Sequence, residues 1–308
     1  MKILVVGELN ADLILRNLSE FPSLGREVLV EEATLTLGSA SAICAAGLAT
    51  LGNQVQFLGK VGADHWGDLC LRRLAACGVD VGPVIRDANI QTGITVSLTS
   101  AEDRALITYL GSIAALRAEE IDLGAFTGCD HLHVSSFFLQ QGLRSGLKQL
   151  LERAHQHGLT TSLDPGYDPQ GTWGRDLYDC LREVDVFLPN EVELEGVTGL
   201  AGVDAALRAL ANGRTLTVSK LGAAGCAVLH MNEVLRIPAF QVKPVDTTGA
   251  GDSFNAGFLH AWLRKESLDE ALRFANACGA LSTLSPGGVG AQPTEGHARE
   301  FLMAGAHT

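Results

Sequence analysis

Short apolar runs alternate with helical patterns along most of the chain. The runs are rich in Val, Ile and Leu and lack apolar–polar alternation, which is typical of strands buried on both faces of a parallel sheet. Apolar residues at helical spacing separate several of them, at 66–77, 143–154 and 205–211. This βαβ rhythm predicts a mostly parallel sheet with helices on both faces. The predicted strands span residues 3–6, 55–58, 131–134, 160–163, 186–188 and 216–219.

Two regions depart from this rhythm. Residues 28–37, and residues 92–99 together with 105–110, are rich in Val, Leu, Ile and Thr and have no helical pattern within them. We interpret them as antiparallel strands of a small second sheet. Because no linker or repeat divides the chain, we expect a single domain over residues 1–308, with a discontinuous β lid from about 12–37 and 91–111.

The C-terminal part of the chain is predicted to be helical. Apolar residues at helical spacing cover 250–263 and 268–284, and a loop rich in glycine follows at 284–290. An alanine-rich segment at 40–51 is predicted to be a buried helix. Glycine and threonine interrupt this segment, and it is too short to span a membrane.

Composition and charge exclude several classes of protein. The 308 residues include 23 Lys and Arg against 35 Asp and Glu, a formal net charge of −12, which argues against a general nucleic-acid binder. We find no run of about 18 apolar residues and no signal-peptide features, so we expect no membrane contact. The seven cysteines are scattered without a C-x-x-C pair, as expected for reduced thiols in a cytoplasmic protein and not for a zinc site.

The most informative segment is D-T-T-G-A-G-D-S-F-N, residues 246–255. Gly249 and Gly251 lie at the start of a predicted helix, so successive backbone N–H groups can point into one cavity. With the helix dipole, these groups form a site for phosphate. Asp252 falls in the first helical turn, where a carboxylate can accept the proton of an attacking hydroxyl. The alternative interpretation is an ordinary helix start with an aspartate favoured by the dipole.

This segment closely resembles the C-terminal signature of the PfkB family, the ribokinase-like carbohydrate kinases. Six further motifs of that family extend the resemblance along nearly the whole chain. They are Gly7-x-x-Asn10-x-Asp12, the glycine-entry helix 38–52, Val61-Gly62-x-Asp64-x-x-Gly67, Pro189-Asn190-x-x-Glu193, Lys220-x-Gly222-x-x-Gly225 and Gly290-Ala291-Gln292-Pro293.

The resemblance implies a three-layer α/β/α fold with a small β-sheet lid that closes over a sugar. It implies ATP-dependent transfer of a phosphoryl group to a hydroxyl of a small sugar or sugar-like substrate. Asp252 would be the general base, and Gly249, Ala250 and Gly251 would form the anion hole with it. Phosphoryl transfer needs alignment, a base and stabilisation of charge on the moving group, which this segment can supply.

The resemblance also implies a site for the nucleotide and magnesium. Asn190 and Glu193 would arrange Mg²⁺ and its waters around the phosphates of ATP, since Mg²⁺ keeps several waters and needs few carboxylates. Taken alone, Glu193 also fits a solvated helix face. Lys220 would reach a phosphate. Further nucleotide contacts are implied for Gly222, Gly225, Gly251 and Asn276.

A monovalent cation site is a further implication of the resemblance. Asp246 and Thr248 match positions that bind such a cation in many relatives, and the loop 285–290 would complete the site. This loop is longer and richer in glycine than the commonest form of the family. Activation by potassium is therefore left open.

Asn10 and Asp12 are expected to hold the sugar. Their alternate spacing after the first strand places both side chains in one crevice, where an amide and a carboxylate can pair with vicinal hydroxyls. Gly38 and Ser39 would complete the site, but this motif departs from the family pattern Gly-Gly-x-x-x-Asn. Ser39 replaces the second glycine and Ile43 the asparagine. Because isoleucine cannot hydrogen-bond a hydroxyl, ribose is not assured as the substrate.

Alternatives to a sugar kinase stay open. A nucleoside kinase of the same family would need an apolar slot for the base, which Phe137, Phe138 and Ile43 can supply. A non-catalytic sugar-binding relative is another. Arg104, in the second lid stretch, fits either a charged substrate or the surface. No G-x-G-x-x-G follows the first strand, which argues against a Rossmann dehydrogenase. Exposed strand edges on the lid favour a homodimer formed through it.

Overall fold

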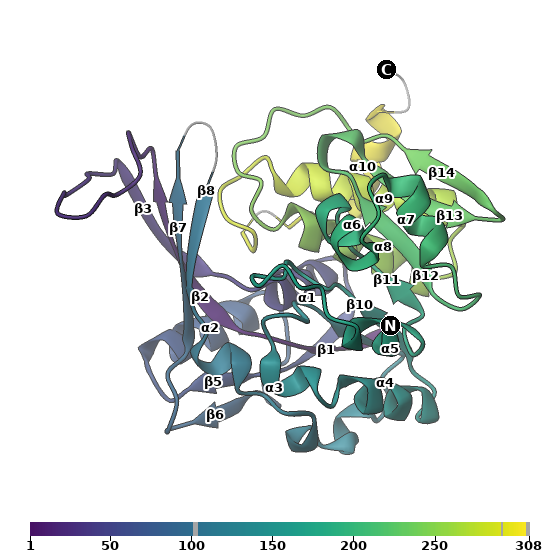
Figure 1. Cartoon of the computed structure of the whole chain (residues 1–308), viewed down its shortest axis with the longest axis horizontal. Coiled ribbons are helices and arrows are strands. Elements are labelled where there is room, and N and C mark those ends of the chain that lie inside the picture. The colour runs from purple at the N-terminus through teal and green to yellow at the C-terminus, as the bar shows by residue number, and fades with distance from the viewer. Residues whose placement is uncertain (101–103, 291, 306–308) are drawn as a thin grey trace.

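A large sheet forms the centre of the protein. The computed structural model describes residues 1–100, 104–290 and 292–305, and its elements are arranged as Figure 1 shows. The strand order is β14-β13-β12-β11-β10-β9-β1-β4, parallel from β12 to β4 and antiparallel at β12–β13–β14. The strands are β1 (Lys2–Val6), β4 (Gln54–Leu58), β9 (His131–Val134), β10 (Thr160–Leu163), β11 (Val186–Phe187), β12 (Leu216–Lys220), β13 (Cys226–His230) and β14 (Glu233–Ile237).

Helices cover both faces of this sheet, which confirms the three-layer fold. In β1, Ile3 and Val5 belong to one apolar cluster while Leu4 and Val6 belong to the other, and all four are fully buried. This explains why the strands are continuously apolar. One layer contains α1 (Ala40–Thr50), α2 (His65–Ala76), α8 (Ala250–Leu263), α9 (Leu268–Ser282) and α10 (Glu295–Gly305), and the other α3 (Gln141–Arg144), α4 (Leu147–Gln156), α5 (Asp176–Leu181), α6 (Glu191–Thr198) and α7 (Val203–Ala209).

A small sheet stands to one side of these layers, on the left of Figure 1. Its strand order is β3-β2-β7-β8, with bounds Glu32–Leu37, Asn10–Arg16, Gly93–Thr99 and Arg104–Tyr109. The second sheet was predicted, but its pairing was only partly right. The pairs β2–β3 and β7–β8 are antiparallel, whereas β2–β7 is parallel. The reason is that β2, which begins four residues after the end of β1, was not predicted as a strand.

Smaller features also differ from expectation. Of the predicted strand 28–37, only Glu32–Leu37 forms a strand, β3. The hairpin β13–β14 was not predicted. A two-stranded sheet joins β5 (Lys60–Gly62) to β6 (Ile85–Asp87). The helix at 40–51 is confirmed as α1. Short 3₁₀ turns lie at Gly111–Ala114, Ala118–Glu120, Leu123–Phe126 and Gly222–Ala224.

All seven cysteines are free thiols, and six of them are buried. Among the described residues, no helix combines the length and the apolar character needed to cross a membrane. Ala291 and the side chain of Arg104 lie outside the described residues.

Candidate active site

The first turn of α8 lies between two cavities. Gly249 is the N-cap residue of this helix and has a left-handed backbone, with φ of 76°. A Cβ atom at this position would lie 2.9 Å from Cγ2 of Ile43, so both conformation and space favour glycine. Backbone N–H groups in the first turn of a helix have no partner within the helix, and they point towards an anion placed there. Asp252 is the third residue of α8.

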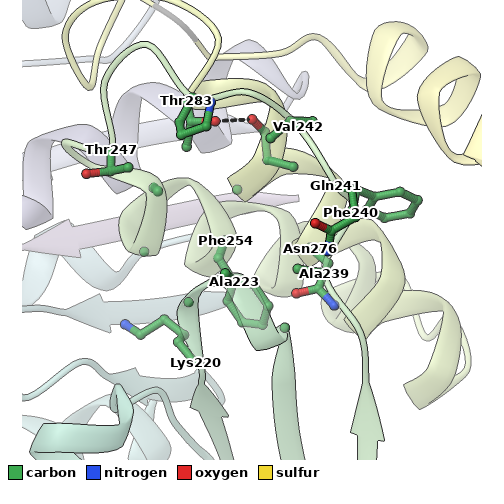
Figure 2. A pocket seen from close by; sticks show the side chains of 17 residues that line it. Lys220, Ala223, Ala239, Phe240, Gln241, Val242, Thr247, Phe254, Asn276 and Thr283 are labelled. Atoms are coloured by element: carbon green, nitrogen blue, oxygen red, sulfur yellow. Dashed lines mark hydrogen bonds between the residues drawn. The ribbon is translucent and has the colours of Figure 1, made fainter.

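One cavity lies on the side of β12, α8 and α9 and has a volume of about 390 Å³. Its walls are mostly small or apolar. Figure 2 shows Lys220 and Thr247 at one end, with Phe240 and Asn276 at the other. Ala250 and Gly251 of the α8 turn form part of the wall. The shape and chemistry fit a flat aromatic base at one end and phosphate groups at the other.

Several of the predicted nucleotide residues line this cavity. Lys220, Gly222, Gly225 and Asn276 are among them. Gly225 has φ of 97°, and a Cβ there would lie 2.0 Å from the Ile237 carbonyl oxygen, which only glycine can avoid. Asn276 is buried, not exposed on the outer face of its helix. Its side-chain amide donates hydrogen bonds to the carbonyl groups of Ile237 and Pro238, each at 3.2 Å.

The second cavity, of about 220 Å³, has acidic groups in a wall that also contains apolar side chains. We call it the acidic cavity. It is enclosed by the small sheet, by the start of α1 and by the loop before α8. Three carboxylates border it, those of Glu8, Asp12 and Asp252. Asn10, Ser39, Thr95, Ser97, Thr108, Ser136, Thr248 and Gly249 supply hydroxyl, amide or backbone groups.

Asn10 and Asp12 face this cavity from β2. The Asn10 amide donates to Oδ1 of Asp12 at 2.7 Å and to the Thr95 hydroxyl at 3.3 Å. Gly38 is not a wall residue, but a Cβ on Gly38 would lie 1.9 Å from Oδ1 of Asp12. The glycine therefore leaves the space in which the two side chains sit. The predicted sugar residues are thus brought together, although by a strand that was not predicted.

The structure shows which contacts Ser39 and Ile43 make at the two positions where the sequence departs from the family motif. Ser39 has the left-handed φ of 78° that suits the usual glycine, and its hydroxyl accepts from the Ala42 N–H at 2.9 Å as the N-cap of α1. Ile43 is 3% exposed and packs between Gly249, the N-cap of α8, and Gly288 of the loop after α9, since Cβ atoms there would lie 2.9 Å from its Cγ2 and 2.6 Å from its Cδ1. Isoleucine thus exchanges a polar contact for packing between α1 and the loops around α8.

Glu8 is a wall residue that sequence reasoning passed over. Its carboxylate accepts hydrogen bonds from the Ser41 hydroxyl, from the Ser41 N–H at 3.2 Å and from the Ser136 hydroxyl at 2.9 Å. Burial raises the pKa of Glu8 above its ordinary value, against the effect of these hydrogen bonds. Its position directly after the first predicted strand was the available signal, because ligands bind at the carboxyl ends of strands.

A buried ion pair lies where the two cavities approach each other. Nζ of Lys220 is 2.6 Å from Oδ2 of Asp164 and 3.3 Å from Oδ1 of Asn255, and the Asn255 amide donates to the same Asp164 oxygen at 2.5 Å. Burial alone would raise the pKa of Asp164, but Lys220 together with the hydrogen bonds from Asn255 and the Gly166 N–H lowers it. Asp164 was not predicted. It follows the strand 160–163 directly, which was again the available signal.

The same charges act on Asp252. Burial, reinforced by the Asp164 carboxylate, raises the pKa of Asp252 well above its ordinary value, while Lys220 opposes that rise. A base with a raised pKa holds a proton more strongly once it has accepted one. Neutralisation of the neighbouring carboxylates would lower this pKa and return Asp252 to its ionised form.

Asn190 and Glu193 form a capping box at the start of α6. Oδ1 of Asn190 accepts from the Glu193 N–H at 2.9 Å, and the Glu193 carboxylate accepts from the Asn190 N–H at 2.8 Å. Glu193 is 5% exposed, so it does not lie on a solvated helix face. Burial and the Asp164 charge raise the pKa of Glu193 to about 7. Neither residue lines either of the two cavities.

The carboxylates of Asp164 and Glu193 are hard oxygen donors of the kind that Mg²⁺ accepts. Among the described residues, no group of three or more His, Cys, Asp or Glu side chains could hold a metal ion alone. A magnesium ion bound with nucleotide phosphates keeps several of its waters. The two carboxylates fit contact through water better than a closed metal cage.

Asp246 is held by three segments of the chain. Its Oδ1 accepts from the Thr248 N–H at 2.9 Å, and its Oδ2 accepts from the Gly287 N–H at 3.0 Å and from the Arg16 guanidinium. Arg16 lies on β2 and was not predicted to contribute to any site. Burial would raise the pKa of Asp246, but these hydrogen bonds and Arg16 lower it.

Comparisons with known proteins agree with this geometry. A family model described as pfkB family carbohydrate kinase matches residues 1–295. An ATP-dependent ribose-1-phosphate kinase of Halopiger xanaduensis is 32% identical over 311 residues, covering 98% of each chain. A ribokinase of Bacillus subtilis is 29% identical, covering 97% of this chain and 99% of the relative.

Solved structures share the fold over nearly the whole chain. The ribokinase of Arabidopsis thaliana complexed with ribose and ATP has a TM-score of 0.85 at 26% identity, and the match covers 97% of this chain and 98% of that one. A candidate ribokinase II of E. coli in complex with ATP and Mg²⁺ has a TM-score of 0.87 at 22% identity, with coverage of 98% and 99%.

Proposed function

Because the chain belongs to the PfkB family of carbohydrate kinases, we propose that it transfers the γ-phosphoryl group of ATP to a hydroxyl of a small neutral sugar, with Asp252 as general base. One observation carries this proposal. The first turn of α8 borders both cavities, with Ala250 and Gly251 in the wall of one and Gly249 and Asp252 in the wall of the other. A phosphoryl group that passes this turn moves from the nucleotide to the sugar.

In the proposed reaction, the sugar hydroxyl lies in the acidic cavity beside Asp252. Its oxygen attacks the γ-phosphorus, a new O–P bond forms, and the bond from that phosphorus to the bridging oxygen of ADP breaks. Asp252 accepts the hydroxyl proton. The N–H groups of Gly249, Ala250, Gly251 and Asp252 stabilise the charge on the transferred group.

At the nucleotide end, Lys220 faces the phosphates from the wall of the cavity. Magnesium, when bound with ATP, neutralises charge on the phosphate oxygens. Asn190, Glu193 and Asp164 would hold its waters. Gly222, Gly225 and Asn276 border the rest of the nucleotide. Of the residues expected at a monovalent cation site, Asp246 and Thr248, the first is already paired with Arg16.

The acidic cavity supports a neutral substrate. Its described wall residues include the carboxylates of Glu8, Asp12 and Asp252 and no lysine or arginine. A sugar phosphate or sugar acid would bring another negative charge into this cavity, which like charges disfavour. Carboxylate, amide and hydroxyl groups together suit a polyol, because each sugar hydroxyl can donate one hydrogen bond and accept others.

A nucleoside is the second candidate, and a different cavity favours it. A space of about 970 Å³ adjoins the acidic cavity, and both share Leu106, Thr108, Ser136 and Leu139. Phe138 and Tyr167 border this larger space and can contact a base. Phe137 is 1% exposed within an apolar core cluster, so it does not contribute to such a slot.

The proposal includes the small sheet as a lid over the sugar and as a dimer contact. Its edge strand β8 exposes Leu106, Ile107 and Tyr109 at 58%, 61% and 52%. An edge strand with exposed apolar residues is prone to pair with another chain. Sedimentation of the wild type and of Ile107→Glu tests this: a dimer that becomes a monomer supports it, and an unchanged sedimentation coefficient contradicts it.

The first test of the function is an ATP-consumption assay with Mg²⁺. Neutral pentoses and hexoses, ribose 1-phosphate, sugar acids and nucleosides serve as acceptors. We expect a neutral sugar to give the highest kcat/KM. A nucleoside in first place would favour the second candidate, whereas preference for an anionic sugar would contradict the electrostatic reasoning from the acidic cavity.

A further inference from the structure

The Asp246 carboxylate is nearly enclosed, and an arginine occupies one side of it. The side chains of Arg16 and Asp246 are 16% and 10% exposed. Asp246 lies in the loop before α8, Gly287 in the loop after α9, and Arg16 comes from the small sheet, 230 residues earlier in the chain. The other terminal nitrogen of the guanidinium, Nη1, lies 4.0 Å from Oε2 of Glu32 on the neighbouring strand β3.

These contacts do not fit a potassium ion at Asp246. A monovalent cation would need a carboxylate oxygen of Asp246, but Oδ2 already accepts from a guanidinium and a backbone N–H, and Oδ1 accepts from the Thr248 N–H. A second positive charge beside Arg16 would be repelled in this poorly solvated position. Arginine keeps its charge at every pH that the protein tolerates.

We propose that the Arg16 guanidinium replaces a monovalent cation in this enzyme, so that the anion hole is ordered without potassium. This rests on the proposed function, because the loop that Arg16 stabilises supplies the anion hole. Arg16 is a positioning residue. It lines neither the nucleotide cavity nor the acidic cavity and acts through Asp246.

The path from Arg16 to the reacting group is short. Asp246 accepts the Thr248 N–H, and Thr248 precedes Gly249, the N-cap of α8. Fixing Asp246 therefore fixes the turn whose N–H groups receive the phosphoryl group. Arg16 is also on the same strand as Asn10 and Asp12, and β2 is paired along both edges by β3 and β7. One strand thus joins the sugar residues to the support of the anion hole.

The decisive variant is Arg16→Met, which removes the charge and keeps most of the side-chain length. Assays compare potassium chloride with tetramethylammonium chloride at equal ionic strength. We expect the wild type to change by less than about twofold between the salts. Without potassium, Arg16→Met should lose roughly 10–100-fold in kcat, the scale of a small displacement of a catalytic group. Potassium should restore much of this loss, because the vacated carboxylate can then bind it.

Arg86→Met is the matched control. Arg86 also pairs with a carboxylate, that of Asp68 at 2.6 Å, but the pair is about half exposed on the surface. This variant should keep wild-type activity in both salts. Arg16→Lys keeps the charge but loses the planar fork, so it should retain more activity than Arg16→Met and respond less to potassium.

A thermal unfolding measurement supplies a readout that needs no turnover. Potassium should raise the Tm of Arg16→Met by roughly 2–4 °C and leave that of the wild type unchanged. Strong potassium activation of the wild type overturns the proposal. So does a folded Arg16→Met whose loss potassium does not reverse, or one that loses no activity. If Arg16→Met does not fold, the salt response of the wild type and of Arg16→Lys decides. A wild type inactive on every acceptor counts against the proposed function alone, since the Tm comparison still tests Arg16.

Discussion

The two cavities beside α8 are built in different ways. The nucleotide-side cavity is lined entirely from residues 220–283, largely by glycine, alanine and other small or apolar residues, so its shape comes from backbone geometry. The acidic cavity draws its walls from segments between Glu8 and Asp252, and carboxylate, amide and hydroxyl side chains lie in its wall beside apolar ones. Under the proposed function, side chains of the sugar site could therefore be exchanged without disturbing the backbone that forms the nucleotide site.

The shared turn is where a single change should have the largest effect. Asp252→Asn removes the proposed base while keeping size and polarity. We expect kcat to fall by roughly 10²–10⁴-fold with nucleotide binding retained. In the wild type, kcat/KM should fall on the acid side as Asp252 becomes protonated, and its raised pKa places this fall above the range of an ordinary aspartate. Steady-state kinetics across pH and nucleotide titration test both; near-normal turnover would remove Asp252 from this role.

The raised pKa of Glu193 should make the free energy of unfolding depend on pH. Glu193 has a folded pKa of about 7 against an ordinary 4.5, so the folded state binds its proton more tightly than the unfolded state does. Its contribution favours folding below about pH 4.5 and is lost as the pH rises to about 7. Glu193→Gln ends this titration, and the amide oxygen can still cap α6.

The Glu193→Gln variant should therefore be more stable than the wild type above pH 7, by up to about 3 kcal/mol, and nearly equal to it at pH 4.5. Unfolding by denaturant without nucleotide or magnesium, at several pH values, measures the gap. Two stability curves that run parallel across this range would contradict the raised pKa.

On the sugar side alone, Asp12→Ala should separate the cavities. It removes a carboxylate from the wall and leaves the Asn10 amide without one of its acceptors. We expect KM for the sugar to rise roughly 10–100-fold, the range for loss of a hydrogen bond to a charged group. KM for ATP should change by less than about twofold. Equal losses for both substrates would show that the cavities are not independent.

The smallest effect is expected from the corresponding substitution in the nucleotide-side cavity, which should change KM for ATP alone. Ala280 on α9 borders that cavity and is 9% exposed. Ala280→Leu adds volume there, so KM for ATP should rise about tenfold while KM for the sugar stays the same. Ala280→Gly, which adds no volume, is the control. An unchanged ATP affinity in the leucine variant would mean that the nucleotide binds elsewhere.

Much of the fold was predictable because it is encoded in neighbouring residues. Continuous apolar runs such as 3–6 are buried on both faces, and the helix at 250–263 begins where its glycines indicate. β2 was missed because Asn10 and Asp12 were interpreted as ligand-binding residues after the first strand, and their alternate spacing was not taken as part of a second strand. Its parallel partner β7 lies some 80 residues away, and local patterns do not identify such a partner.

The layered fold and the candidate phosphate-binding segment 246–255 could be predicted from the chain alone, since both depend on residues that are consecutive or regularly spaced. The pairing of distant charged side chains, in contrast, depends on how the chain folds. Lys220 pairs with Asp164, 56 residues away, and Arg16 with Asp246, 230 residues away. The sequence around one residue of such a pair does not identify the other residue. The pairing follows from strand order and from closure of the small sheet against the core, so the roles of Arg16 and Asp164 emerged only once the chain was folded.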